Sequence, residues 1–150
     1  KVIRVVLATH GGLGKAMLET AALISCGTEN VRTIELYPGG GAEDVEAALR
    51  QELSELEEGD EVLCLVDIPG GSPARAAAGL VLESPSLHVV SGLNLGMLAE
   101  ALLLKDSMDI EQLKGHIMTA ATGTIVDLGS KLLEQLQEDP KAKKVMEGIV

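Results

Sequence analysis

The residue whose type and position most suggest chemistry is His10, in the stretch ATHGGLGKAM that covers residues 8–17. An aliphatic run typical of a buried strand ends just before it, and two glycines, Gly11 and Gly12, follow it. A neutral imidazole is a nucleophile near pH 7, because its unperturbed pKa is about 6.5. A reactive histidine is therefore the favoured interpretation, while position alone leaves a packing role open.

A second stretch with chemical potential is VDIPGGSP, residues 66–73, which also follows an apolar run. Asp67 is a carboxylate that could hold one ring nitrogen of a histidine and leave the other free to attack. Gly70 and Gly71 allow close approach of the backbone. Ser72 is expected at the start of a helix, where its hydroxyl caps the helix, binds a phosphoryl oxygen, or does both. Together these residue types suit a phosphoryl group held without a metal ion.

Glycine-rich turns after a first strand also occur in nucleotide-binding proteins, but both common fingerprints fail here. The dinucleotide pattern G-x-G-x-x-G/A finds Gly12 and Gly14, but Met17 stands where a small residue is needed. The Walker pattern fails because Ala16 follows Gly14-Lys15 and supplies no hydroxyl for magnesium. We therefore expect no bound nucleotide.

The remaining histidines and the cysteines give no metal site. His10, His88 and His116 share no ligand spacing, and neither Cys26 nor Cys64 belongs to a C-x-x-C pair. We expect His88 to be a partly buried, hydrogen-bonded side chain and His116 to be solvated. Both cysteines are interpreted as small core residues. The sequence thus predicts neither a metal nor another cofactor.

Composition narrows the class of partner and the compartment. The net charge of −11 argues against nucleic acid, which requires clustered Lys and Arg. The same charge would attract a basic protein partner, although simple solubility explains it equally well. No apolar run approaches the ~20 residues of a membrane span. With no leader-like start and unpaired cysteines, we expect a cytoplasmic protein.

Short apolar runs alternate with segments of helical period, which favours a parallel α/β fold. The predicted strands are 2–8, 31–36, 61–67 and 87–90, and the predicted helices are 13–25, 42–58, 73–82, 95–104 and 109–121. Ser72 is expected as the N-cap of its helix with Pro73 at the first helical position. Residues 124–128 (TIVDL) are compatible with a short strand, and a charged helix broken at Pro140 follows.

The expected architecture is a doubly wound, mainly parallel sheet of strand order 2-1-3-4 with helices on both faces. In that order the first and third strands are neighbours, so His10 and Asp67 meet in one crevice beyond the strand ends. Free backbone N–H groups at the starts of two helices would point into the same crevice. Lys15 and Arg75 lie one turn into those helices, and we expect both side chains to be solvated.

Three motifs, THGGLGKAML, LVDIPGGSPARAA and SGLNLGMLAEALL, together resemble the IIA domain of the mannose/fructose/sorbose-type phosphotransferase system. The resemblance runs from about residue 2 to residue 126. It implies that His10 accepts a phosphoryl group on Nε2 from the phosphocarrier HPr and passes it to a IIB component. Through IIB, the partners include the membrane IIC/IID sugar transporter. Asp67 matches the family's orienting aspartate.

The resemblance also assigns the phosphoryl-binding positions and the assembly. Gly11, Gly12, Gly71 and Ser72 match the family's phosphoryl-binding turns. The family is homodimeric with an exchanged late strand, expected here at residues 124–128 as an antiparallel fifth strand. We therefore divide the chain into a IIA domain, 1–129, and a C-terminal segment, 130–150, that is either a helical extension of its own or the start of a linker to a IIB domain.

Two positions depart from the family pattern. Pro69 replaces the bulky residue usual before G-G-S-P, and Gly96 replaces the proline of N-x-P-M-L. Neither touches the phosphoryl site, but Pro69 can alter partner contacts.

Two other functions stay open at this point. The phosphotransfer subunit of dihydroxyacetone kinase has a related first domain, and a flavodoxin-like small-molecule binding module would share the sheet. Partner identity distinguishes the first, and a bound chromophore would reveal the second. The transported sugar cannot be read from this chain, since IIA domains do not contact it.

Overall fold

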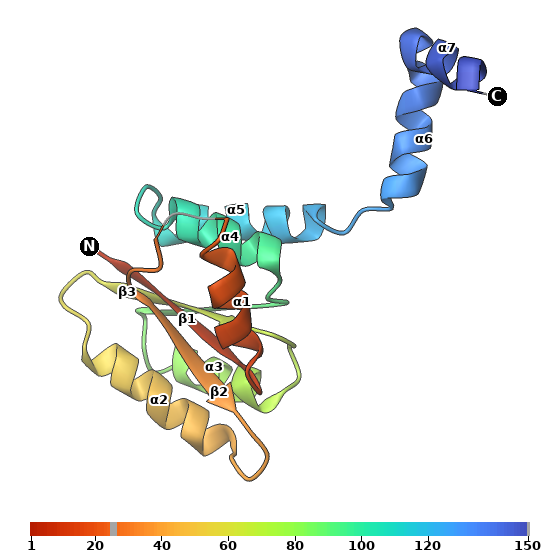
Figure 1. The fold of residues 1–150 in the computed structure, drawn as a ribbon. Coiled ribbons are helices and arrows are strands. Elements are labelled where there is room, and N and C mark those ends of the chain that lie inside the picture. Colours follow the sequence, from red (N-terminus) through yellow and green to blue (C-terminus); the bar gives the residue numbers. More distant parts are fainter. Residues whose placement is uncertain (25–26, 150) are drawn as a thin grey trace.

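A four-stranded parallel sheet organises the chain (Figure 1). The computed structural model describes residues 1–24 and 27–149. Its strands are β1 (Ile3–His10), β2 (Val31–Leu36), β3 (Glu61–Val66) and β4 (Leu87–Ser91). Their order is β2-β1-β3-β4, with every neighbouring pair parallel. The predicted strand order is confirmed.

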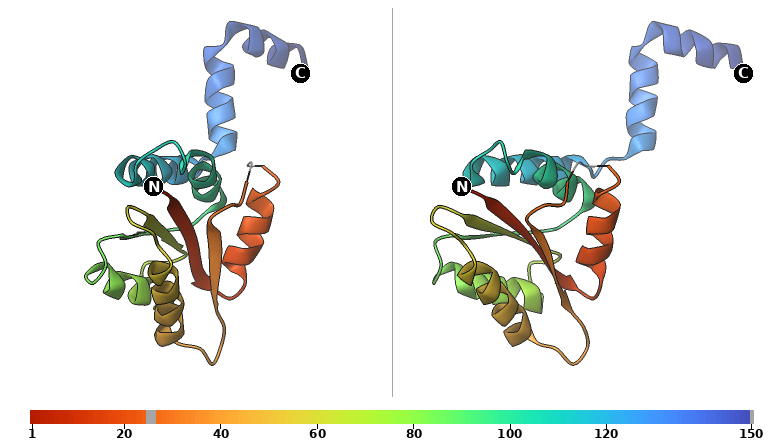
Figure 2. Two further views of the ribbon diagram at one scale, coloured as in Figure 1. Left: turned by 90° about the vertical axis from the view of Figure 1, so that its left-hand side faces the viewer. Right: turned by 60° about the vertical axis from the view of Figure 1, so that its left-hand side comes forward.

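Helices cover both faces of this sheet, as Figures 1 and 2 show from three directions. The helices are α1 (Leu13–Ala21), α2 (Ala42–Ser54), α3 (Ser72–Val81), α4 (Leu95–Leu104), α5 (Ile110–Gly123), α6 (Leu128–Glu138) and α7 (Pro140–Ile149). Helices α2 and α3 pack on one face, and α1, α4 and α5 lie on the other. The fold is therefore the doubly wound arrangement that the alternating pattern predicts.

The central strand β1 shows how the sequence separates the two faces. Val5 and Leu7 belong to the apolar cluster under α1, α4 and α5, whereas Val6 and Ala8 belong to the cluster under α2 and α3. All four side chains are fully buried. Successive residues of a strand point to opposite faces, so a continuous aliphatic run is what a strand covered on both sides requires.

Two helices end earlier than their sequence patterns suggest. The helix expected over 13–25 ends at Ala21, and Leu23 and Ile24 follow in turns with 85% and 65% of their surface exposed. A further helical turn there would bury no apolar surface, so tertiary packing does not stabilise it. The helix expected over 42–58 ends at Ser54. The structure of Cys26 lies outside the described residues, so its predicted core role is not tested.

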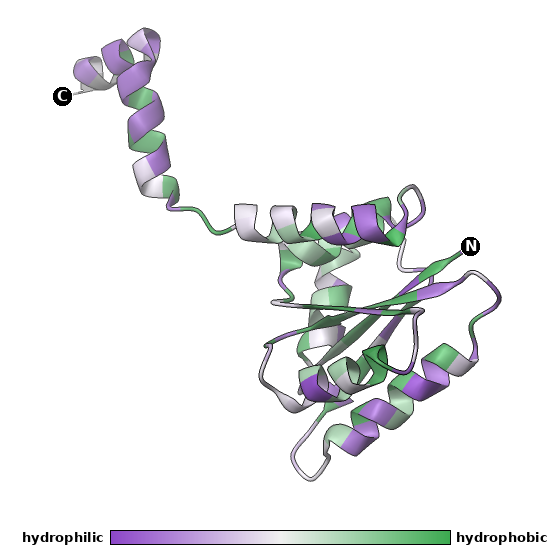
Figure 3. Cartoon of the chain, turned by 180° about the vertical axis from the view of Figure 1, so that it is seen from behind, coloured by the Kyte–Doolittle hydropathy of each residue, from purple (hydrophilic) through white to green (hydrophobic). Residues whose placement is uncertain are grey.

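The C-terminal helices extend away from the sheet and its covering helices (Figures 1 and 2). No described residue of α6 is buried, although Figure 3 shows hydrophobic positions along this helix. Residues 124–127 connect α5 to α6 without regular structure. The fifth strand expected at 124–128 is thus absent from the described part of a single chain, and its exchange with a second chain stays a prediction.

One further property concerns membranes. None of the helices in the described ranges 1–24 and 27–149 is both long enough and apolar enough to cross a lipid bilayer.

Candidate active site

Strand register brings His10 and Asp67 together, although 57 positions separate them in sequence. Ala8 of β1 lies opposite Val66, the last residue of β3. Strand β1 continues two residues further than β3, to His10, which lies opposite Leu36 of β2. The strand therefore includes His10, whereas the sequence suggested that it ends at residue 8. Asp67 is the first residue beyond β3 and lies beside His10.

The carboxylate of Asp67 holds His10 through two hydrogen bonds to one oxygen. Oδ2 accepts from the backbone N–H of His10 at 2.9 Å and lies 2.8 Å from ring nitrogen Nδ1. The other oxygen, Oδ1, accepts from the backbone N–H of Ile68 at 2.9 Å. A proton on Nδ1 satisfies this geometry and leaves the lone pair on Nε2.

The surroundings of Asp67 keep it ionised. Burial by itself raises the pKa of this carboxyl. The backbone and ring hydrogen bonds from His10, with that from Ile68, outweigh burial, so the pKa is lowered below its ordinary value of 3.8. A carboxylate that stays charged at neutral pH favours one tautomer of the ring and also stabilises positive charge on it.

The free side of the imidazole faces solvent next to the start of α3. The His10 side chain is 46% exposed, whereas that of Asp67 is 11% exposed. A Cβ atom added to Gly71 would overlap Cε1 of His10 and lie 3.1 Å from Nε2. Gly71 is the N-cap of α3, so Nε2 of His10 lies against the beginning of that helix. Free N–H groups at a helix N-terminus favour an anion at this place.

The glycine turn after His10 is held by β2 and a tyrosine. Gly11 has a φ of +55°, a conformation that glycine adopts without strain, and its N–H donates to the carbonyl of Leu36 at 2.7 Å. A Cβ on Gly12 would lie 3.2 Å from the hydroxyl of Tyr37. Tyr37 is half-exposed and donates to Glu35 at 2.9 Å. Sequence reasoning missed Tyr37, which carries no motif signal.

Thr9 is a second residue that sequence reasoning missed. Its buried hydroxyl accepts the N–H of Gly14 at 2.9 Å and so stabilises the first turn of α1. A Cβ on Gly14 would lie 3.1 Å from Cβ of Leu7, which explains the glycine at this close approach of helix and strand. The available signal was a hydroxyl residue just before the turn. Strand alternation directs Thr9 towards α1 and His10 towards α3.

Ser72 does not cap its helix, contrary to one of the expected roles. Gly71 is the N-cap, Ser72 is the first helical residue, and Pro73 is the second. The Ser72 hydroxyl instead accepts a hydrogen bond from Nη2 of Arg75 at 3.1 Å. Its own proton is therefore free to be donated. The predicted positions of Ser72 and Pro73 were wrong by one residue because Gly71 already adopts the extended conformation of a cap.

A family comparison decides what this arrangement belongs to. The sequence model of the family described as "PTS system fructose IIA component" matches residues 4–118. The chain belongs to this IIA family. The predicted resemblance to the phosphotransferase system is confirmed.

Known relatives agree with the family assignment. The chain is 36% identical over 104 residues to the "PTS system mannose-specific EIIAB component" of Escherichia coli (strain K12), covering 69% of this chain and 32% of that protein. It is 30% identical to the "PTS system fructose-specific EIIA component" of Bacillus subtilis (strain 168), covering 77% and 80%. It therefore spans about a third of the E. coli relative and most of the B. subtilis one.

A solved structure gives the same result for the fold. The crystal structure of phosphotransferase system component EIIA from Streptococcus agalactiae superposes with a TM-score of 0.79 at 30% identity. The match covers 86% of this chain and 99% of that one. The sheet and its helices are thus those of the IIA family.

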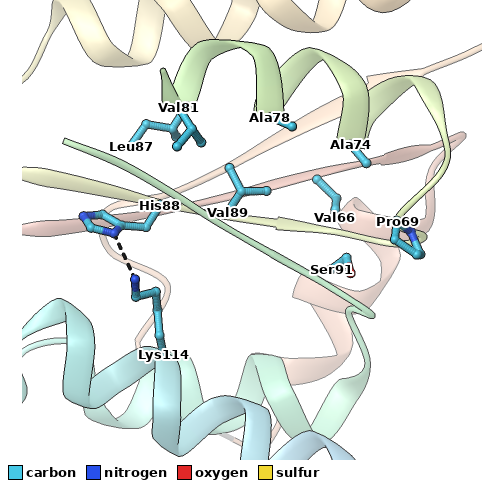
Figure 4. Close-up of a pocket in the computed structure, with 10 residues that line it drawn as sticks. All are labelled: Val66, Pro69, Ala74, Ala78, Val81, Leu87, His88, Val89, Ser91 and Lys114. Carbon is cyan, nitrogen blue, oxygen red and sulfur yellow. Dashed lines mark hydrogen bonds between the residues drawn. The ribbon is translucent and has the colours of Figure 1, made fainter. Parts of the chain in front are cut away.

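This IIA chain also has a groove along the outer edge of β4, and His10 is not among the residues that line it (Figure 4). It measures about 450 Å³ and is lined by Val66, Pro69, Ala74, Ala78, Val81, Leu87, His88, Val89, Ser91 and Lys114. Its walls come from α3 on one side and α5 on the other, with β4 between them. Strand β4 pairs only with β3 among the described strands, so its other edge is open.

The other residues singled out from the sequence lie outside the candidate site. His88 is partly buried, with Nε2 2.9 Å from Glu61 and Nδ1 3.3 Å from Lys114, which confirms its predicted satisfied state. His116 is 45% exposed and lies 3.0 Å from Glu100. Cys64 is fully buried, and burial raises the pKa of its thiol to about 12. Within the described ranges, no cluster of three or more potential metal ligands forms.

The two departures from the family pattern have different surroundings. Pro69 lines the β4 groove. A Cβ on Gly96 would overlap Cγ2 of Thr124, so this glycine allows α4 to approach the end of α5. Asn94 caps α4 as expected, accepting from the N–H of Met97 at 2.9 Å.

Proposed function

We propose that this chain is a phosphocarrier of the sugar phosphotransferase system. His10 accepts a phosphoryl group from phospho-HPr and passes it to a IIB component for sugar uptake. The observation that carries the proposal is the held imidazole. Asp67 fixes Nδ1 at 2.8 Å, and Nε2 is exposed at the start of α3. The family assignment over residues 4–118 supports it.

The chemistry requires no metal and no net proton transfer. The lone pair of Nε2 attacks phosphorus, and the bond from phosphorus to the donor's imidazole nitrogen breaks, its electron pair returning to the donor. The proton of His10 stays on Nδ1, where Asp67 holds it. Gly11, Gly12 and Gly71 let the backbone approach the phosphoryl oxygens, and Ser72 donates its free hydroxyl proton.

The partners follow from this assignment. HPr delivers the phosphoryl group, and IIB carries it to the IIC/IID membrane transporter. The net charge of −11 would speed association with a basic partner surface. The chain would then act in the cytoplasm and meet the membrane only through these partners.

A homodimer fits the open edge of β4. We assign residues 124–128 as the exchanged segment, which would add an antiparallel strand to β4 of a second copy. Ile125 is 82% exposed and Val126 is 41% exposed in the single chain, so this segment has apolar side chains to bury. The groove between α3 and α5 offers apolar walls beside the edge. Residues 1–129 would then form the IIA domain, with 130–150 as a helical extension.

Phosphorylation with radiolabelled phosphoenolpyruvate, enzyme I and HPr tests the phosphocarrier function. We expect an acid-labile, alkali-stable label on the wild type and none on His10→Ala. His116→Ala is the matched control, because it removes another exposed histidine outside the site. An unlabelled wild type, in a mixture that labels another IIA protein, would refute the proposal. Transfer of the label to a nucleotide-bound kinase subunit instead of IIB would favour the dihydroxyacetone kinase role.

A further inference from the structure

We propose that Arg75 binds the phosphoryl group while it moves to and from His10. This inference rests on the function proposed above and adds a residue that the motif comparison did not assign. Its basis is the position of the guanidinium over the first turn of α3, where it is hydrogen-bonded to Ser72.

Helix geometry directs Arg75 towards the site. Ser72 and Arg75 are three residues apart on α3, so they lie on the same side of the helix, and helical side chains tilt towards the N-terminus. The 3.1 Å bond from Nη2 of Arg75 to Oγ of Ser72 shows this direction. The adjoining residue Gly71 contacts the His10 ring. The guanidinium therefore lies on the same helix end that faces Nε2.

Arg75 differs from the other arginines in the pairing of its positive charge. Arg4, Arg32 and Arg50 each lie within 4.0 Å of a glutamate carboxylate. Within residues 1–24 and 27–149, Arg75 has no such ion pair, although the chain contains 23 acidic residues. One of its five N–H donors is used by Ser72, which leaves a fork suited to two phosphoryl oxygens. A phosphoryl group would supply the missing anion.

The main chain at the starts of α3 and α1 offers few free N–H groups to a phosphoryl group, so a side-chain donor would add to the binding. Pro73 occupies the second position of α3 and has no N–H, and the N–H of Gly14 on α1 is already bonded to Thr9. Fewer main-chain donors than usual therefore face the crevice. The arriving phosphoryl group is also negative and lies near the Asp67 carboxylate. A guanidinium at this helix end offsets that repulsion and stabilises charge that spreads over the phosphoryl oxygens during transfer.

The experiment compares transfer rates from phospho-HPr to wild type, Arg75→Ala and Arg75→Lys by rapid quench. We expect Arg75→Ala to lower the maximal rate constant by about 10- to 100-fold, because a charge-assisted hydrogen bond is lost. Arg75→Lys should regain part of the rate. Guanidinium ion added at millimolar concentration should accelerate Arg75→Ala but not the wild type. An unchanged rate for Arg75→Ala would overturn the inference.

Two control variants exclude indirect roles. Lys15→Ala removes a positive charge one turn into α1, so an equal loss there would assign the effect to docking charge and overturn the proposal. In a Ser72→Ala background, Arg75→Ala should still slow transfer. Loss of its effect there would mean that Arg75 only positions the hydroxyl. If the wild type itself carries no label on His10, the proposed function fails. A labelled wild type with an unaffected Arg75→Ala refutes only the role of Arg75.

Discussion

At the scale of single residues, the site depends on one carboxylate and one glycine. Asp67 receives three hydrogen bonds, two of them from His10, so it fixes both the backbone and the ring of this histidine. Gly71 leaves the space in which that ring lies. Both residues can be substituted without changing His10 itself.

Asp67→Asn should slow phosphorylation of His10 by about 10- to 100-fold, because an amide cannot stabilise imidazolium character as a carboxylate does. Rapid-quench labelling from phospho-HPr measures this loss. A rate equal to that of the wild type would remove the orienting role from Asp67.

The same variant has a pH signature in stability. The pKa of Asp67 is lowered in the folded protein, so its contribution is present above the ordinary value of 3.8 and is lost as pH falls through the lower folded value. We expect Asp67→Asn to cost about 1 kcal/mol of unfolding free energy at pH 7, with a shrinking difference below pH 3.8. Urea unfolding at pH 7 and pH 3 measures it. A constant difference would contradict this assignment.

Gly71→Ala should separate activity from stability. The added Cβ overlaps Cε1 of His10, but an exposed ring can rotate away at little cost to folding. We expect the melting temperature to change by only a few degrees and the labelling rate to fall at least tenfold. Gly70→Ala is the control, because a Cβ there meets no atom within 4 Å. Equal rates for the two variants would refute the close packing of His10 on Gly71.

At the scale of elements, the capping residues at helix N-termini stabilise the helices α1, α4 and α5, which cover one face of the sheet. Asn94 caps α4 through Met97, and its Nδ2 also donates to the carbonyl of Ala121 near the end of α5 at 3.2 Å. One side chain thus joins two helices that cover the same face. The first turn of α1 depends likewise on Thr9, and that of α5 on a capping box between Asp109 and Gln112.

Asn94→Ala should destabilise the protein by about 1–2 kcal/mol, since it removes an N-cap and a part-buried bond. Chemical denaturation measures the change. Asp127→Ala removes the comparable cap of α6, where no described residue is buried, and should leave global unfolding unchanged. Equal losses for both variants would show that α6 is coupled to the core.

At the scale of the whole molecule, the protein consists of a covered sheet and a C-terminal extension, none of whose described residues belongs to the core. Helices α6 and α7 contact one another beyond residue 127. The connection at 124–127 is irregular, carries the exposed apolar side chains of Ile125 and Val126, and leads from α5 to α6. Two truncations therefore separate the role of the connection from that of the helices.

Truncation after residue 129 should leave labelling and the oligomeric state unchanged, because it keeps the segment proposed for exchange. Truncation after residue 123 should give a monomer, since it removes that segment. Sedimentation equilibrium of both forms, beside the intact chain, measures their masses. A monomeric intact chain would refute the exchanged strand, and a dimeric 1–123 form would place the interface elsewhere.

The sequence by itself determined the sheet order, the pairing of His10 with Asp67 and the family. Aliphatic runs covered on both faces, turn glycines and motif order are local signals, and parallel register then brings the two strand ends together. Only the tertiary structure decided what depends on contacts between distant elements. These are the packing of His10 on Gly71, the hydrogen bond between Thr9 and Gly14, and the shift of the α3 cap from Ser72 to Gly71. Another is the guanidinium of Arg75, which is hydrogen-bonded to Ser72 and forms no ion pair with a described carboxylate. Such contacts depend on side-chain direction and on close approach in space, which residue spacing alone does not determine.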